Sequence, residues 1–205
     1  MNCRGKETRR KIIQNYEIKP IAHIKLISGR KVRSDAGHEI TDSYYVFDCK
    51  HRITGEKDVI QCGEPVAKDF LELIQSDPLP IFNPLSEDGK LCVDSINLRN
   101  RNAKTSLKKW NLAAKQLYNA IMILIVAWDA KPNTPLFKMK EDSEKYYGCT
   151  PYISRIKPIN NILKSKNLTI SNVIEKLSEN NNLKKYEFNL LNDILESQGE
   201  KSFLI

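Results

Sequence analysis

Residues 44–62 decide the fold, and they read YYVFDCKHRITGEKDVIQC. The first half of this stretch is rich in aromatic and β-branched side chains, which favour strands. Its less charged side chains alternate with Asp48, Lys50 and Arg52, as expected of a strand with one face on a core. Because Thr54-Gly55-Glu56 suits a tight turn, the stretch predicts an antiparallel β-hairpin.

The segments on either side of the hairpin extend this prediction. Upstream, residues 23–27 alternate as a short strand, and residues 1–16 form a basic arm. Downstream we expect a helix over 65–75, since proline suits the first helical turn, where its missing N–H would have no partner in any case. The apolar stripe of this helix comprises Val66, Phe70, Leu73 and Ile74.

The second half of the chain is helical in pattern. We expect its longest helix over 105–128, capped by Thr105 or Ser106. Residues 120–128 are apolar on every side, which predicts that this part of the helix is the centre of a core. Three short helices follow within 154–198.

Strands come first along the chain and helices later, an order typical of α+β proteins and not of an alternating parallel sheet. We therefore expect an N-terminal β-hairpin or small antiparallel sheet with one helix, packed on a C-terminal helical part led by a long buried helix at about 105–128. The chain forms a lobe of residues 1–85 and a mainly helical lobe of residues 86–205, or one continuous domain.

The composition excludes several classes of protein. With 40% hydrophobic and 28% charged residues, the chain is ordinary for a globular protein and too apolar for a disordered one. No stretch approaches the roughly 18 apolar residues of a membrane span, and no apolar segment follows the basic first residues as in a secretory signal. The five scattered cysteines predict thiols or metal ligands in a reducing cytoplasm.

The net charge of +8 is unevenly distributed. Residues 1–33 carry ten bases against two acids, residues 34–94 carry thirteen acids against five bases, and residues 95–128 carry six bases and no acid. Two basic blocks around an acidic one predict either a surface that binds a polyanion or an internal match of opposite charges.

We assign nucleic-acid contacts to the two basic blocks. Each phosphate contact would release counterions and would therefore weaken with salt. Tyr16, Trp110 and Tyr118 lie near these bases in sequence and either stack on nucleobases or pack in the core. The predicted contact residues are Arg4, Lys6, Arg9, Arg10, Lys11, Arg30, Lys31, Arg33, Arg99, Arg101, Lys104, Lys108 and Lys109.

Cys49, His51 and Cys62 form the candidate metal site. Cys49 and His51 are two residues apart on a strand and share a face. A loop of Gly55-Glu56 places Cys49 directly opposite Cys62, a loop of Thr54-Gly55 places them diagonally on one face, and a three-residue loop puts them on opposite faces. Three such ligands suit tetrahedral Zn²⁺. A core face with buried thiols is the alternative, and a fourth ligand would come from Cys92, Cys149, His23 or His38.

Two catalytic alternatives use the same hairpin. Cys62 precedes a helix start, where the helix dipole lowers a thiol pKa, and His51 would act as its base. A nuclease would use Asp48-Cys49-Lys50 with an upstream acid, Asp35 or Asp42, to hold a divalent ion.

Residues 162–177 resemble the spacing of a helix-turn-helix motif. Asn167 stands where that motif has a turn glycine, and asparagine tolerates the left-handed conformation. Ile170 and Ile174 would occupy the groove-facing side, where a DNA reader needs polar side chains. A plain helical hairpin is therefore the alternative.

From these features we expect a non-enzymatic, cytoplasmic accessory component that contacts nucleic acid through basic surfaces and binds a protein partner, with no membrane partner. The over-use of Asn, Lys and Ile, which have AT-rich codons, indicates a bacterial or mobile-element complex. Two alternatives remain open. One is a metal-dependent nuclease or hydrolase centred on the hairpin at 44–62, and the other is a protein–protein adaptor whose basic arm meets an acidic partner.

Overall fold

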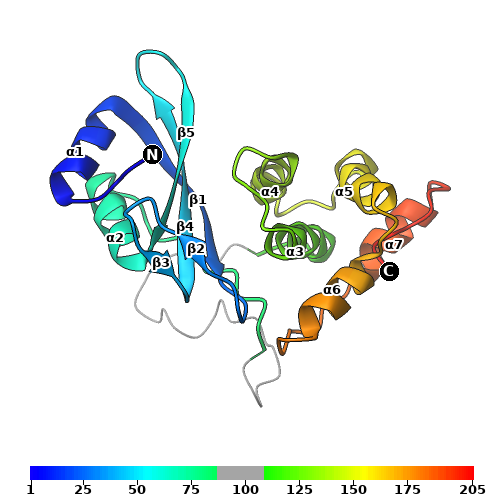
Figure 1. Ribbon diagram of the computed structural model, residues 1–205. Helices are drawn as coiled ribbons and strands as arrows, with labels where there is room; N and C mark the ends of the chain where they lie inside the picture. Colours follow the sequence, from blue (N-terminus) through cyan, green and yellow to red (C-terminus); the bar gives the residue numbers. More distant parts are fainter. Residues whose placement is uncertain (87–108) are drawn as a thin grey trace. The chain divides into compact units, whose positions relative to one another are not determined.

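The computed structural model describes residues 1–86 and 109–205. The chain divides into two compact units, Met1–Pro84 and Leu85–Ile205 (Figure 1). The first unit is a small antiparallel sheet with helices, and the described part of the second consists of helices and loops. The protein is α+β, as the order of strands and helices predicts.

The sheet of the first unit has three strands in the order β1-β4-β5. These are β1 (Tyr16–Lys25), β4 (Ser43–His51) and β5 (Lys57–Gly63), and neighbouring strands are antiparallel. The predicted hairpin is therefore confirmed as β4 and β5, and β1 lies along the other side of β4. A small separate ribbon, β2 (Val32–Arg33) with β3 (Glu39–Ile40), lies in the connection between β1 and β4.

Strand β1 is longer than its pattern predicts. It begins at Tyr16, within the segment expected as a basic arm. The charges of Glu17 and Lys19 alternate with half-buried residues, and the register shifts between Pro20 and Ala22. A bulge beside a proline interrupts the period of two on which the sequence prediction depends.

Two helices lie on the same face of the sheet, α1 (Lys6–Asn15) and α2 (Glu64–Leu73) (Figure 1). Helix α2 has a proline in its first turn, as predicted. Its fully buried residues are Ala67, Phe70 and Leu71, whereas Leu73 is 43% exposed. The buried face of α2 is thus rotated about the helix axis from the predicted apolar stripe. The prediction that Leu73 belongs to the buried stripe was wrong.

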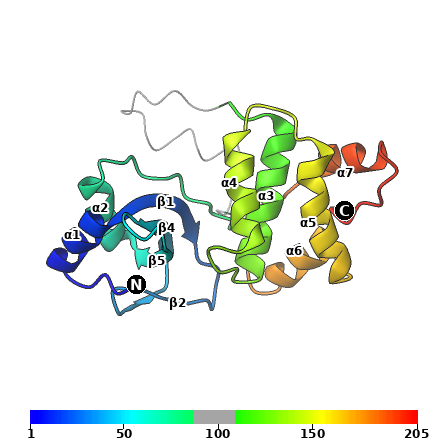
Figure 2. The ribbon, with the colours of Figure 1, turned by 90° about the horizontal axis from the view of Figure 1, so that it is seen from above.

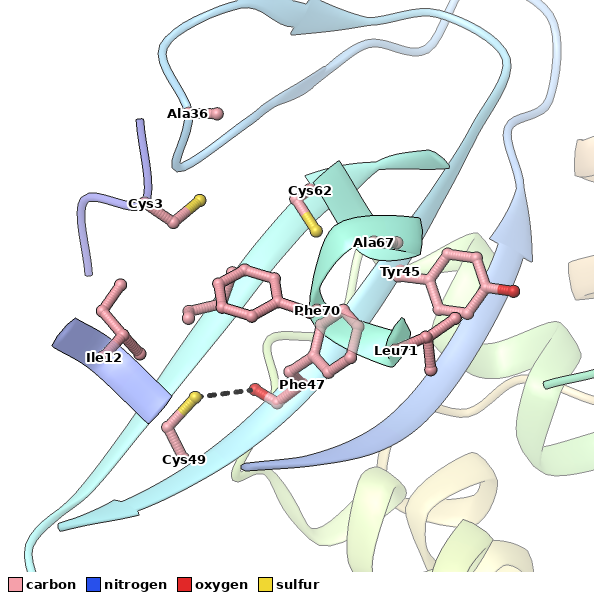
Figure 3. Packing of buried hydrophobic residues seen from close by; sticks show 11 residues of the cluster. Cys3, Ile12, Ala36, Tyr45, Phe47, Cys49, Cys62, Ala67, Phe70 and Leu71 are labelled. Atoms are coloured by element: carbon pink, nitrogen blue, oxygen red, sulfur yellow. Dashed lines mark hydrogen bonds between the residues drawn. The ribbon is translucent and has the colours of Figure 1, made fainter. Parts of the chain in front are cut away.

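A single apolar cluster fills the space between these two helices and the sheet (Figure 3). Ile12 enters it from α1, Phe47 from β4 and Phe70 from α2, and the ring centroids of Phe47 and Phe70 are 5.4 Å apart. Each such side chain contributes about 1.5–3 kcal/mol on full burial. This cluster holds both helices on one face of the sheet.

The second unit is organised around α3 (Leu112–Ala127). Helix α3 packs against α4 (Pro135–Lys145), α6 (Ile170–Ser178) and α7 (Asn189–Glu196), and α5 (Ile153–Ser165) packs against α7. Figure 2 shows α4 running alongside α3. Every residue from Ala120 to Val126 is buried, which confirms the prediction for these positions, whereas Ala127 and Trp128 at the end of the predicted stretch are half-buried.

Two features of the second unit differ from the sequence analysis. Helix α3 begins at Leu112, where the side chain of Asn111 accepts hydrogen bonds from the amides of Ala113 and Ala114. The predicted cap at Thr105 or Ser106 lies outside the described residues. Helix α4 was not expected, because two of its buried positions are polar, Lys140 and Ser143, and they mask the apolar periodicity.

None of the helices within residues 1–86 and 109–205 is long and apolar enough to cross a lipid bilayer.

Candidate functional site

The hairpin that contains the candidate metal ligands closes with a four-residue loop. The amide of His51 donates to the carbonyl of Glu56 at 2.8 Å, and the amide of Gly55 donates to the carbonyl of His51 at 2.9 Å. Gly55 has φ +73°, a conformation that glycine adopts without steric cost. The sequence analysis expected a loop of two or three residues. The strand pairings that it derived from such loops are therefore wrong.

This register separates the two cysteines along the sheet. Cys49 lies opposite Asp58, and Cys62 lies opposite Tyr45. Both thiols face the apolar cluster, but they are four residues apart along the ladder, about 13 Å of strand. Zinc ligands must all lie within about 2.3 Å of one ion. The predicted set of Cys49, His51 and Cys62 is therefore not assembled.

The thiols of the first unit belong to its apolar core. Cys3, Cys49 and Cys62 are each 0% exposed, and Figure 3 shows them among the side chains of this cluster. Burial raises the pKa of Cys49 to about 12 and the pKa of Cys3 to about 11, and it also raises the pKa of Cys62. Metal ligation and nucleophilic attack both need the thiolate. The structure therefore supports the interpretation as core thiols, and burial outweighs the helix dipole at Cys62.

His51 has a structural task at the hairpin loop. Its Nδ1 accepts hydrogen bonds from the amides of Ile53 at 3.4 Å and Thr54 at 3.1 Å. Its ring meets Tyr16 edge to face, with centroids 4.9 Å apart. A ring nitrogen occupied by two backbone amides orders the loop and is not open to a metal.

The carboxylates of the nuclease alternative are held in separate places. Oδ2 of Asp35 accepts from the amide of Gln61 at 2.7 Å, and Asp42 pairs with Lys25. Asp42 is six residues from Asp48, about 20 Å if the strand is extended. Within residues 1–86 and 109–205, no three His, Cys, Asp or Glu side chains gather as metal ligands.

Part of the N-terminal basic block is paired inside the first unit. Arg9 is 7% exposed, and its Nη2 lies 2.5 Å from Oδ2 of Asp69. The Nζ of Lys31 lies 2.9 Å from Oε2 of Glu39. Arg9 was predicted to contact nucleic acid, but its guanidinium is enclosed between α1 and α2 and is not available at the surface.

The other predicted contact residues fall into three groups. Arg4, Lys6, Lys11, Arg33 and Lys109 are exposed. Arg10 is exposed and pairs with Glu7, and Arg30 is half-buried. The residues that lie outside the described part of the chain are Arg99, Arg101, Lys104 and Lys108.

The segment that resembles a helix-turn-helix is a hairpin of α5 and α6. Asn167 has φ +52°, so the predicted left-handed turn is confirmed. Ile170 is 0% exposed and packs in the core, which supports the plain helical hairpin given as the alternative to a DNA-reading motif. The amides of Ile170 and Ser171 donate to the carbonyls of Phe203 and Ile205. Because the start of α6 is covered in this way, it does not offer a free helix end to DNA.

Aromatic and basic side chains gather where α3 begins and where α4 leads into α5. The Trp110 ring lies 5.1 Å from Tyr118 and 5.8 Å from Tyr147 between centroids, and Nζ of Lys115 lies 5.2 Å from the Trp110 ring. Tyr118 packs against Trp110 and is half-buried, and burial raises the pKa of its hydroxyl. Asn111 ties it to the α4–α5 loop, since its amide nitrogens donate to the carbonyl of Tyr147 and to Oγ1 of Thr150.

The α4–α5 loop adds two further tyrosines and two further bases. Cζ of Arg155 lies 3.5 Å from the Tyr146 ring centroid and 5.9 Å from that of Tyr152, and Nζ of Lys145 lies 5.2 Å from the Tyr146 ring. Tyr152 is 73% exposed. We call the whole group, together with the exposed Lys109 next to Trp110 in sequence, the aromatic–cation surface, and it comprises Lys109, Trp110, Lys115, Lys145, Tyr146, Tyr147, Tyr152 and Arg155.

The two segments that build most of this surface lack acids, whereas the end of α4 directly before Lys145 carries Glu141, Asp142 and Glu144, of which Glu144 pairs with Lys140. Residues 109–128 carry two bases and residues 145–174 carry five, and neither segment contains Asp or Glu. Among the described residues, Lys109, Lys145 and Arg155 have no carboxylate within ion-pair distance. Sequence reasoning identified Lys109 and Trp110 but missed Tyr146, Tyr152 and Arg155. The available signal was the acid-free stretch 145–174, which the division into larger charge blocks concealed.

Comparison with known proteins gives a family. No curated protein and no solved structure was found to match the chain. One family model covers residues 1–202, almost the whole length, and its description is "Uncharacterised conserved protein UCP028583". The chain belongs to this family of uncharacterised conserved proteins, UCP028583.

Proposed function

We propose that the protein is a non-enzymatic accessory component that contacts nucleic acid, and that the aromatic–cation surface makes this contact. The observation that carries the proposal is the gathering of bases and aromatic rings from two acid-free segments, 109–128 and 145–174. Lysine and arginine attract phosphates, and tyrosine or tryptophan rings stack on nucleobases. A surface that offers both suits a nucleic acid better than it suits a purely ionic partner.

The first unit supports the proposal less strongly than the second. Residues 1–84 contain fourteen bases and twelve acids, and Arg9, Lys25 and Lys31 are paired with acids of the same unit. Charges that neutralise one another add little attraction for a polyanion. We therefore move the centre of the proposed contact from the N-terminal block to the aromatic–cation surface.

The proposal includes a cytoplasmic location and a protein partner in a bacterial or mobile-element complex. The four described cysteines, Cys3, Cys49, Cys62 and Cys149, are free thiols. Unpaired cysteines are typical of a reducing compartment, which supports the location.

Fluorescence anisotropy with labelled oligonucleotides tests the contact. Between about 50 and 200 mM salt the affinity should fall steeply. Each phosphate contact removed should make the negative slope of log K against log salt shallower by about 1. The test variant is Lys109→Gln with Lys145→Gln. Its matched control is Arg10→Gln with Lys31→Gln, which removes two exposed bases that already have carboxylate partners. An equal loss in both variants, or no binding at low salt, would contradict the proposed site.

A protein–protein adaptor is the second candidate, and one observation favours it. Leu112 is 75% exposed at the first position of α3, next to Trp110. Exposed leucine beside tyrosine, tryptophan and arginine is also the composition of a protein interface. A protein partner that stays bound after nuclease digestion, and that the Leu112→Asp variant no longer binds, would favour the adaptor.

A further inference from the structure

The two most accessible rings of the aromatic–cation surface are arranged around one guanidinium. Arg155 stacks on Tyr146 with its Cζ 3.5 Å from the ring centroid, and it lies 5.9 Å from the centroid of Tyr152. Tyr146 is 37% exposed and Tyr152 is 73% exposed. Arg155 therefore covers Tyr146 and leaves most of the Tyr152 side chain in water.

A large exposed aromatic ring beside lysine and arginine side chains suits a ligand that has both phosphates and flat rings. In a duplex each base is stacked between its neighbours, so only the base edges reach a protein. An unpaired base has a free face and can stack on tyrosine or on an arginine plane. Tyr152 with Arg155 thus offers a platform for a base that is already unstacked.

The residues around Tyr152 and Arg155 suit the phosphates on either side of a stacked nucleobase. Lys145 lies over the Tyr146 ring; Glu144, directly before it, is paired with Lys140, and the next acid along the chain is Glu175. Helix α5 starts directly after Tyr152, without a side-chain cap and without an acid in its first turn. The positive end of the helix dipole adds to the attraction for phosphate.

We infer that the aromatic–cation surface binds single-stranded nucleic acid, with a base stacked on Tyr152 and the flanking phosphates at Lys145 and Arg155. The inference rests on the proposed function and narrows it from nucleic acid in general to unpaired strands. The phosphates of duplex nucleic acid could still contact the same lysine and arginine side chains. Its nucleobases are stacked inside the duplex, so the tyrosines would add no affinity.

Three probes of equal length separate base stacking from phosphate attraction. They are an oligothymidylate of about 15 nucleotides, within the range of single-strand site sizes, the matching duplex, and an abasic single strand that has the phosphates without the bases. The full chain should bind the oligothymidylate at least about fivefold more tightly than either of the others, since one stacked base accounts for that factor.

Variants at Tyr152 then identify the ring. Tyr152→Ala should weaken oligothymidylate binding at least about fivefold and leave abasic binding unchanged, whereas Tyr152→Phe should retain the affinity because the ring is kept. Ile53→Ala is the control, since it also removes a large exposed side chain, 90% exposed at the hairpin loop, outside the aromatic–cation surface. Equal binding of all three probes, or full affinity in Tyr152→Ala, would overturn the single-strand inference and leave the proposed function standing. Failure of all three probes to bind would overturn both.

Discussion

Nη2 of Arg9 lies 2.5 Å from Oδ2 of Asp69, and this ion pair joins α1 to α2 on the face of the sheet that they share. Nη1 of Arg9 also donates to the carbonyl of Cys3 at 3.1 Å. The N-terminal segment, the first helix and the second helix therefore meet at one guanidinium. A base that sequence alone counts as surface charge is thus part of the packing of the first unit.

Asp69→Asn is expected to destabilise the first unit, because it leaves a buried guanidinium without its opposite charge. We expect the free energy of unfolding to fall by about 2–3 kcal/mol, somewhat less than for a fully enclosed pair, since the Asp69 side chain is 30% exposed. Urea denaturation measures the loss. Glu7→Gln, which removes the exposed partner of Arg10, should cost below about 0.5 kcal/mol. Similar costs in the two variants would contradict the role of Arg9.

The buried thiols predict that stability falls at alkaline pH. A thiol whose pKa is raised on folding must ionise more easily in the unfolded chain, so its stabilising effect is complete below the unfolded pKa and is lost above it. For Cys49 the loss begins near the ordinary pKa of 9.0 and continues to about 12. Thermal unfolding followed from neutral pH to about pH 10 checks this dependence. Cys49→Ala should make the decline shallower, and an unchanged decline would show that other groups cause it.

The reactivity of the thiols should follow their burial. Cys149 is exposed, whereas Cys3, Cys49 and Cys62 are buried in the apolar cluster. A thiol reagent added to the native protein should modify Cys149 within the fast phase, because access and thiolate character control the rate. In Cys149→Ser the fast phase should lose one equivalent. Fast modification of Cys49 or Cys62 would show that the cluster opens.

Two lysines lie directly opposite each other at the turn end of the hairpin. Lys50 and Lys57 are cross-strand partners on β4 and β5, and both are exposed. Like charges directly opposite each other destabilise a sheet. Lys57→Glu should therefore raise the free energy of unfolding by about 0.2–1 kcal/mol, with Lys57→Gln in between. A loss of stability in Lys57→Glu would mean that the two ammonium groups are already kept apart by solvent.

Asn111 is expected to couple the start of α3 to the aromatic–cation surface. Its side chain accepts from the amides of Ala113 and Ala114 and donates to Oγ1 of Thr150 in the α4–α5 loop. Asn111→Ala should cost about 1–2 kcal/mol through loss of the cap. Asn111→Asp keeps the acceptor for α3 but loses the donor to Thr150, so it should retain most of the stability. Equal losses in the two variants would show that the bond to the loop matters more than the cap.

Local sequence patterns were sufficient to predict an element where a residue type strongly favours one backbone conformation. The alternation at 44–53 predicted β4, Pro65 predicted the start of α2, and Asn167 predicted the left-handed turn between α5 and α6. The apolar run from Ala120 to Val126 predicted a buried helix. Helix α4 escaped detection because Lys140 is buried with its Nζ 2.6 Å from Oε1 of Glu144, a contact that no apolar period reveals.

The candidate sites depended on distances that such patterns do not contain. Cys49, His51 and Cys62 have suitable side chains for zinc, but a loop two residues longer than expected separates the two thiols along the sheet. Conversely, Trp110 and Tyr152 are 42 residues apart in sequence, and the packing of α4 against α3 and the bond from Asn111 to Thr150 place their segments together.

The amino-acid sequence by itself determined the class of the fold, the existence of the hairpin and the buried helix, because side-chain periodicity and backbone preferences act over a few residues. Only the tertiary structure decided which charges remain at the surface. Arg9 and Lys140 are enclosed, whereas Lys145 is exposed and Arg155 is half-buried beside exposed tyrosines. The physical reason is that an ionic partner is chosen by proximity in space, and segments far apart in the chain become neighbours only when the core packs.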